Sequence, residues 1–110
     1  MITVLVVCDP GRSGELDAAA VRMPSLELLH AHDVEQALDR LARNRRIDAV
    51  LLLLEPDRTA EVASTILEED PAGPPLFAPE ASAGAEVRPL PADGPEDLLR
   101  QVVRKLSASG

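Results

Sequence analysis

The sequence predicts an α/β fold in which a parallel β-sheet is covered by helices on both faces. Continuous aliphatic runs that are typical of buried strands alternate along the chain with segments whose apolar residues recur at helical spacing. This alternation indicates strand–helix–strand units joined by right-handed crossovers. The chain has 110 residues, which is the length of a single domain.

In the first half of the chain, each expected element follows from a run of apolar residues and the turn residues that bound it. Ser13 is expected to cap the first helix and Asp33 the second, because short polar side chains accept from free amides at a helix start. The expected elements are a buried strand at 2–8, a loop at 9–14, a helix at about 14–22, an edge strand at 26–31 and a helix from Asp33 to about Asn44.

The second half repeats the pattern with shorter strands. Pro95 suits the first turn of a closing helix, because proline lacks the amide hydrogen that this turn leaves unbonded. The expected elements are a buried strand at 48–54, a helix from Asp57 or Thr59 to Glu69, a weak strand at 74–78, a loop at 79–86, a short strand at 86–90 and a helix from about 95 to 106. We expect one domain over 1–106, followed by a frayed tail at 107–110.

These short units suit a flavodoxin-like, three-layer architecture with five parallel strands in the order 2-1-3-4-5. The segment 79–86, between the fourth and fifth strands, is too short for a full helix. The fourth helix of that architecture is therefore expected to be shortened or missing.

The composition excludes several classes of function. The net charge is −8 and Phe77 is the single aromatic residue, so direct binding to nucleic acid is not expected. One cysteine, Cys8, cannot form an internal disulfide, which fits a reducing compartment. No apolar run reaches the roughly 18 residues that a membrane span needs. We therefore expect a cytoplasmic protein without a membrane segment and without a cofactor.

Several segments resemble, in order and spacing, the signatures of response-regulator receiver domains. The resemblance covers nearly the whole chain. The segments are 4–10 (VLVVCDP), 31–38 (AHDVEQAL), 48–56 (DAVLLLLEP), 83–90 (AGAEVRPL) and the closing helix at 95–106.

The resemblance implies a phosphorylation pocket whose chemistry this chain has lost. Cys8 stands where receivers carry the first acid of a pair, and Asp9 stands for the second. The phospho-accepting position falls on Leu53, counted from the opening Asp48, or on Leu52, counted back from Pro56. Leucine has no nucleophilic oxygen and cannot form an acyl phosphate.

The remaining pocket positions are also changed. The resemblance places the switch serine or threonine near Ala78. At the position where receivers carry a lysine, this chain has Arg88. Receivers hold Mg²⁺ with two or three carboxylates, because a hard cation prefers oxygen ligands. The resemblance therefore implies a pseudo-receiver, a protein-interaction module of bacterial signalling that is not an enzyme and is not switched by aspartyl phosphorylation.

An alternative interpretation makes Cys8 a catalytic nucleophile. Residues 8–14 follow the first strand and resemble the phosphocysteine loop of sugar phosphotransferase-system IIB proteins, in which loop amides hold the phosphate. Cys8 and Gly11 fit that loop. Asp9 and Pro10 do not, because an acid repels phosphate and proline removes an amide donor.

The sequence predicts where a protein partner or a second copy would bind. A missing fourth helix is expected to leave apolar surface beside the last strand and the last helix. The candidate interaction face consists of Val87, Leu90, Leu98 and Gln101.

Two further polar groups have structural interpretations. His30 and His32 lack the companion ligands of a metal site, so we expect a structural or surface role for them. Arg40, Arg43, Arg45 and Arg46 cluster at a helix end, where cations offset the helix dipole. A docking patch for an acidic partner is the other interpretation of this cluster.

Overall fold

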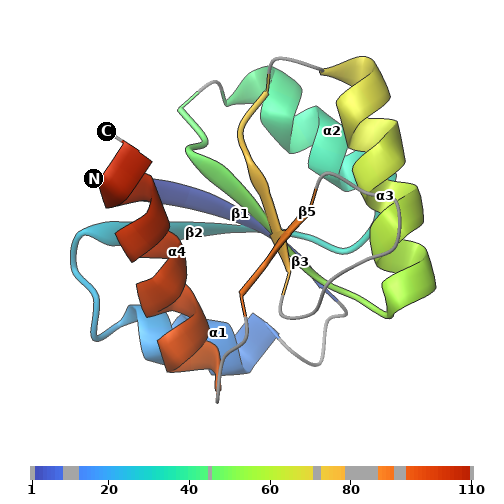
Figure 1. Cartoon of the computed structure of the whole chain (residues 1–110). Coiled ribbons are helices and arrows are strands. Elements are labelled where there is room, and N and C mark those ends of the chain that lie inside the picture. Colours follow the sequence, from blue (N-terminus) through green and yellow to red (C-terminus); the bar gives the residue numbers. More distant parts are fainter. Residues whose placement is uncertain are drawn as a thin grey trace.

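The computed structural model describes residues 2–8, 13–44, 46–70, 73–78, 87–90 and 94–109. Strands and helices alternate along these residues (Figure 1). They are β1 (Ile2–Cys8), α1 (Ser13–Ala20), β2 (Leu26–Ala31), α2 (Val34–Arg43), β3 (Ala49–Leu53), α3 (Pro56–Glu69), β4 (Leu76–Ala78), β5 (Val87–Pro89) and α4 (Pro95–Ser109).

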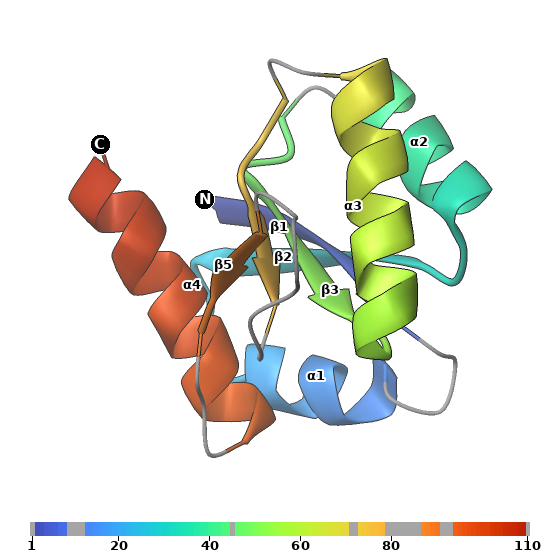
Figure 2. The same cartoon turned by 45° about the vertical axis from the view of Figure 1, so that its right-hand side comes forward.

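The five strands form one parallel sheet in the order β2-β1-β3-β4-β5. Helices α1 and α4 cover one face of the sheet, and α2 and α3 cover the other (Figure 2). The structure thus confirms the predicted three-layer arrangement and strand order. The segment 79–86, where the fourth helix was expected to be shortened or missing, lies outside the described residues.

The core consists of two apolar clusters, one on each face of the sheet. Alternate residues of β1 belong to different clusters: Val4 and Val6 face α1 and α4, whereas Leu5 and Val7 face α2 and α3. Successive side chains of a strand point to opposite faces, so a central strand buried on both sides is mostly apolar, as β1 is at every position except Thr3. This pattern explains why the run at 2–8 was recognisable as a strand.

Helix α2 begins as its sequence predicts. Asp33 is its N-cap, and its Oδ1 accepts a hydrogen bond from the amide of Gln36 at 2.8 Å. This bond satisfies one of the amides that a helix start leaves free. The helix ends at Arg43, with Asn44 as its C-cap.

Helix α3 begins earlier than predicted. It starts at Pro56, after the N-cap Glu55, whereas the sequence suggested Asp57 or Thr59. Thr59 is buried, and its Oγ1 donates backwards to the carbonyl of Leu54 at 3.1 Å. The hydroxyl therefore stabilises the turn between β3 and α3 and does not cap a helix start.

The other helix ends also differ by a few residues from the predicted ones. Helix α1 ends at Ala20, before the expected position 22. Ser13 is the first residue of this helix, whereas the sequence suggested that it caps the helix from the position before it. Helix α4 continues to Ser109, so it includes most of the segment that was assigned to a frayed tail. Gly110 lies outside the described residues.

Within the described residues, every helix is too short or too polar to span a lipid bilayer.

Candidate functional site

Cys8 and Leu53 lie next to each other at the carboxyl-terminal ends of β1 and β3. The two residues are register partners in the parallel pairing of these strands. Cys8 is 0% exposed and Leu53 is 7% exposed. The two positions that the motif alignment assigns to an acid and to a phospho-acceptor are therefore adjacent, buried and apolar.

Ala78 completes this edge of the sheet at the end of β4. It is 2% exposed, and its carbonyl accepts a hydrogen bond from the amide of Leu90 at 2.7 Å. This bond extends the pairing of β4 with β5 beyond Pro89. We call the region formed by Cys8, Leu53 and Ala78 the carboxyl edge.

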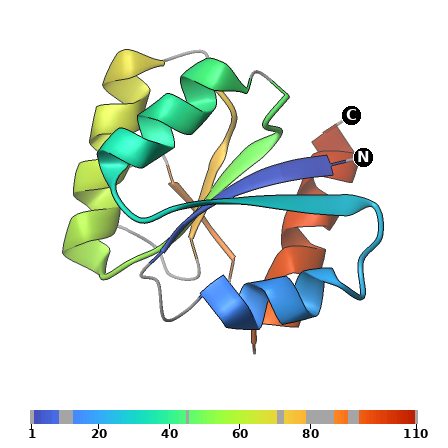
Figure 3. The ribbon, with the colours of Figure 1, turned by 180° about the vertical axis from the view of Figure 1, so that it is seen from behind.

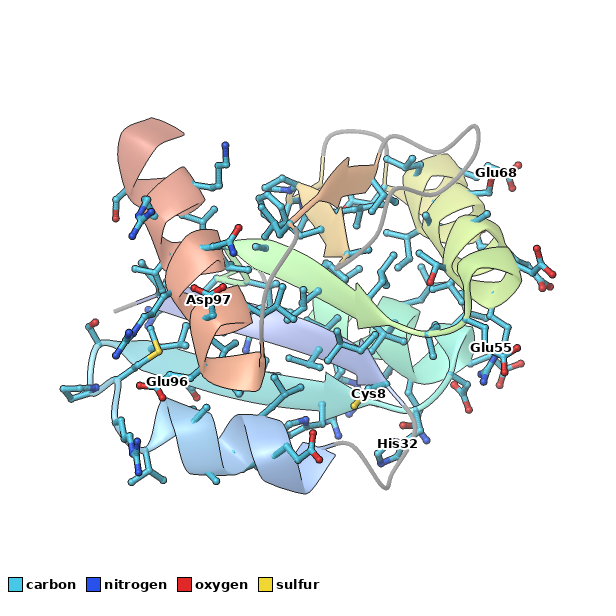
Figure 4. The ribbon with its side chains drawn as sticks, turned by 60° about the horizontal axis from the view of Figure 1, so that its bottom comes forward. Cys8, His32, Glu55, Glu68, Glu96 and Asp97 are labelled. Carbon is cyan, nitrogen blue, oxygen red and sulfur yellow. The ribbon has the colours of Figure 1, made fainter. Side chains whose placement is uncertain are left out.

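Two polar side chains near the carboxyl edge, those of His32 and Thr59, bind backbone atoms. Nδ1 of His32 donates to the carbonyl of Cys8 at 3.2 Å, and Figure 4 shows the two residues close together. Thr59 holds the turn after β3, as described above. Glu55 is exposed at the start of α3 and makes no side-chain cap bond. The sequence predicted a structural or surface role for His32 but gave no signal for its bond to Cys8.

The structure describes the side chain of neither Asp9 nor Arg88, the two remaining predicted pocket residues. Asp9 lies outside the described residues. Arg88 lies in β5, in register with Phe77 of β4. Among the residues that the structure describes, no three His, Cys, Asp or Glu side chains are grouped so that they could hold a metal ion.

The burial of Cys8 bears on the phosphocysteine interpretation. Its side chain belongs to the apolar cluster under α1 and α4. A phosphocysteine must be reached by a phosphoryl donor, and reactive cysteines are partially exposed. The geometry therefore favours a structural role for Cys8.

The predicted interaction face is wrong for three of its four residues. Val87, Leu90 and Leu98 are 7%, 1% and 4% exposed, and all three belong to the core. A side chain that is already buried cannot form a docking surface. Only Gln101 is half-exposed, and its Nε2 donates to Asp97 at 3.1 Å.

The remaining polar side chains that the sequence singled out form local contacts. Nε2 of His30 lies 2.7 Å from Oδ1 of Asp17 and so links β2 to α1. At the end of α2, Arg43 forms an ion pair with Asp39 at 2.9 Å. Both contacts fit the structural roles that were expected.

Comparison with known proteins gives a consistent assignment of the fold. No family model and no curated protein matches this chain. A LuxR family DNA-binding response regulator from Silicibacter pomeroyi is 25% identical, with 98% of this chain and 93% of that chain covered and a TM-score of 0.63. The response regulator TrrA from Thermotoga maritima, solved with Mg²⁺ and BeF, is also 25% identical, with 96% and 99% coverage and a TM-score of 0.67.

A third similar structure is the complex of the phosphorylated P1 domain of CheA3 with CheY6 from R. sphaeroides. It is 21% identical over 96% of this chain and 97% of the matched chain, with a TM-score of 0.61. The chain has the fold of a response-regulator receiver domain. In this receiver-like domain, the carboxyl edge occupies the end of the sheet at which open α/β folds place their ligands.

Proposed function

We propose that this receiver-like domain is a pseudo-receiver that acts through protein–protein contacts and is not switched by aspartyl phosphorylation. One observation carries the proposal: Cys8 and Leu53 are paired at the carboxyl edge and are both buried and apolar. The motif alignment assigns to these positions the groups on which receiver chemistry depends.

The side chains of the carboxyl edge cannot replace that chemistry. An acyl phosphate requires a carboxylate oxygen that attacks the phosphoryl donor, and leucine offers a hydrocarbon in its place. Mg²⁺ requires oxygen ligands, whereas Cys8, Leu53 and Ala78 offer a sulfur atom and methyl groups. Asp9 alone would leave a bound cation with too few protein oxygens.

The proposed partner is a protein. The similar complex from R. sphaeroides joins a phosphorylated P1 domain to CheY6, which supports protein binding as the output of this scaffold. The net charge of −8 opposes direct binding to a phosphate backbone. The proposal requires no cofactor and no catalytic step, and it places the protein in the cytoplasm.

The test is incubation of the purified chain with acetyl phosphate and Mg²⁺, followed by intact-mass measurement. TrrA, which binds Mg²⁺ and BeF in its solved structure, serves as the positive control. The proposal expects no added phosphate and no bound beryllofluoride in the ¹⁹F spectrum. Phosphate on Asp9 or on a residue of β3 would refute it, and phosphate on Cys8 would establish the phosphocysteine alternative.

A further inference from the structure

Strand β2 presents a long open edge. It has six residues and stands at the end of the strand order, whereas the opposite edge strand, β5, has three residues and ends at Pro89. Natural sheets protect their edges by short strands, prolines and charges. Strand β2 contains a single residue with full charge, Glu27, beside the half-exposed Leu28 and Leu29. Figure 3 shows β2 at the rim of the sheet.

The hydrogen bonds to β1 fix which backbone groups of β2 face outward. The amide of Ile2 donates to the carbonyl of Ser25 at 2.8 Å, and Ile2 is in register with Leu26. In a parallel ladder, alternate residues bond to the same neighbour, so Glu27, Leu29 and Ala31 face β1. The amide and carbonyl groups of Leu26, Leu28 and His30 therefore face away from the sheet.

One of these outward amides is already bonded. The amide of Leu26 donates to the carbonyl of Met23 at 3.0 Å. None of the described residues bonds the outward backbone groups of Leu28 and His30. These two residues thus offer two donors and two acceptors to a neighbouring strand.

We propose that β2 pairs antiparallel with β2 of a second copy of this chain, so that one sheet runs through both copies. A two-fold axis at Leu29 sets Leu28 opposite His30 of the second copy and His30 opposite its Leu28. Directly opposed residues of a hydrogen-bonded pair exchange both bonds. This register satisfies every outward amide and carbonyl of Leu28 and His30.

The neighbouring registers leave some of these groups unbonded. A shift of the axis to Leu28 sets His30 opposite Leu26, whose amide is already taken by Met23. A shift to His30 sets Leu28 opposite His32, whose amide donates to Oε1 of Gln36 at 3.0 Å. The register centred on Leu29 is therefore the favoured one.

Side chains across the proposed interface are also compatible. On the α2 side, Leu29 meets its own copy at the axis, and Glu27 lies opposite Ala31. On the α1 side, Leu28 lies opposite His30. Like charges directly opposite each other destabilise a strand pair, and this register contains none.

The flanking helices add complementary charge. Helix α2 contacts both β2 and β1, so it lies over the edge strand β2 and its neighbour β1. Neighbouring strands are about 4.8 Å apart, which brings the two α2 helices to roughly 10 Å, a normal packing distance for helices. An open groove of about 510 Å³ runs along this rim and is lined by residues of β2, the following turn and α2: His30, His32, Glu35, Gln36, Asp39 and Arg40.

Around the two-fold axis, the two α2 helices run antiparallel. The exposed charges of the helix are acidic in its first part, at Glu35 and Asp39, and basic at its end, at Arg40 and Arg43. An antiparallel arrangement sets the acidic part of one helix against the basic end of the other. The second copy is therefore a partner whose charges match this surface.

Sedimentation equilibrium of the whole chain tests the proposal over low to high micromolar concentrations. The wild type is expected to reach twice the chain mass of 11.7 kDa. Leu29→Lys places two ammonium groups at the axis and should weaken the dimer at least about tenfold. Val21→Lys is the control for the added charge, because Val21 is 83% exposed and lies outside β2; it should leave the dimer unchanged.

A charge exchange at exposed positions of α2 and a hydrogen-exchange measurement complete the test. Glu35→Arg and Arg43→Glu should each weaken the dimer, and the double variant should restore it. In the wild-type dimer, the amides of Leu28 and His30 should exchange slowly with solvent, and in Leu29→Lys they should exchange quickly. If the wild type stays monomeric at these concentrations, the proposal is wrong. The edge of β2 would then be available to a different protein. A dimer in which both amides exchange quickly overturns it equally, because the contact then lies elsewhere.

Discussion

Asp48 and Thr3 are joined by two hydrogen bonds at the start of β3 and β1. The amide of Thr3 donates to Oδ2 of Asp48 at 2.9 Å, and the amide of Asp48 donates to the carbonyl of Thr3 at 2.7 Å. Thr3 is 7% exposed, so its amide depends on the carboxylate for a partner. Asp48, which directly precedes β3, therefore joins the starts of β1 and β3 through hydrogen bonds.

Replacing this carboxylate should destabilise the domain. Asp48→Ala leaves the amide of Thr3 without an acceptor, which costs about 1–3 kcal/mol. Asp48→Asn retains an oxygen at the same place and should cost clearly less. Urea unfolding followed by circular dichroism measures both. Equal stability of the wild type and the alanine variant would show that water replaces the carboxylate.

Much of the fold was predictable because it depends on local pattern. The run at 2–8 is apolar at every position except Thr3, as expected of a strand buried on both faces, and Asp33 precedes a helix with a clear apolar face. The start of α3 was not predictable in the same way. Thr59 has the chemistry of a cap, but burial directs its hydroxyl to Leu54, and burial depends on tertiary packing.

The candidate site shows the same division. Cys8, Leu53 and Ala78 were chosen by motif spacing, and the structure brings them to one edge because parallel strands end on the same side of a sheet. The candidate interaction face assumed an uncovered surface near Leu90 and Leu98. Whether a side chain is exposed depends on all elements that pack around it, and no local pattern records this.

Restoring an acid at the acceptor position should damage the fold without restoring phosphorylation. Leu53 is 7% exposed, and an uncompensated buried charge costs about 3–5 kcal/mol. Leu53→Asp should therefore unfold at a much lower urea concentration than the wild type. It should also gain no phosphate from acetyl phosphate and Mg²⁺, because Cys8 supplies no oxygen ligand beside it.

Leu53→Met is the control for this substitution. It conserves volume and polarity, and such changes usually cost less than about 1.5 kcal/mol. If Leu53→Asp were as stable as Leu53→Met, the side chain would have access to solvent and the assigned register would be wrong.

Cys8 should behave as a small core residue. Cys8→Ser buries a hydroxyl in an apolar cluster and should cost about 1–3 kcal/mol, whereas Cys8→Ala should cost less because it adds no polar atom. In the native protein, a thiol reagent should react with Cys8 only as fast as the domain opens. Rapid modification at low denaturant would indicate an accessible thiolate and support the phosphocysteine interpretation.

The last prediction concerns Leu90, where the structure reverses the expectation from sequence. Leu90 is 1% exposed and packs in the same apolar cluster as Leu98 and Leu99. Leu90→Ala should cost about 2–5 kcal/mol, because it removes buried contacts and leaves a cavity. Gln101→Ala, on the half-exposed side of α4, should change stability by less than about 0.5 kcal/mol. Thermal unfolding of the two variants distinguishes a core position from a surface one. A Leu90→Ala variant that melts with the wild type but loses self-association would restore the face around the last strand and helix as the docking surface.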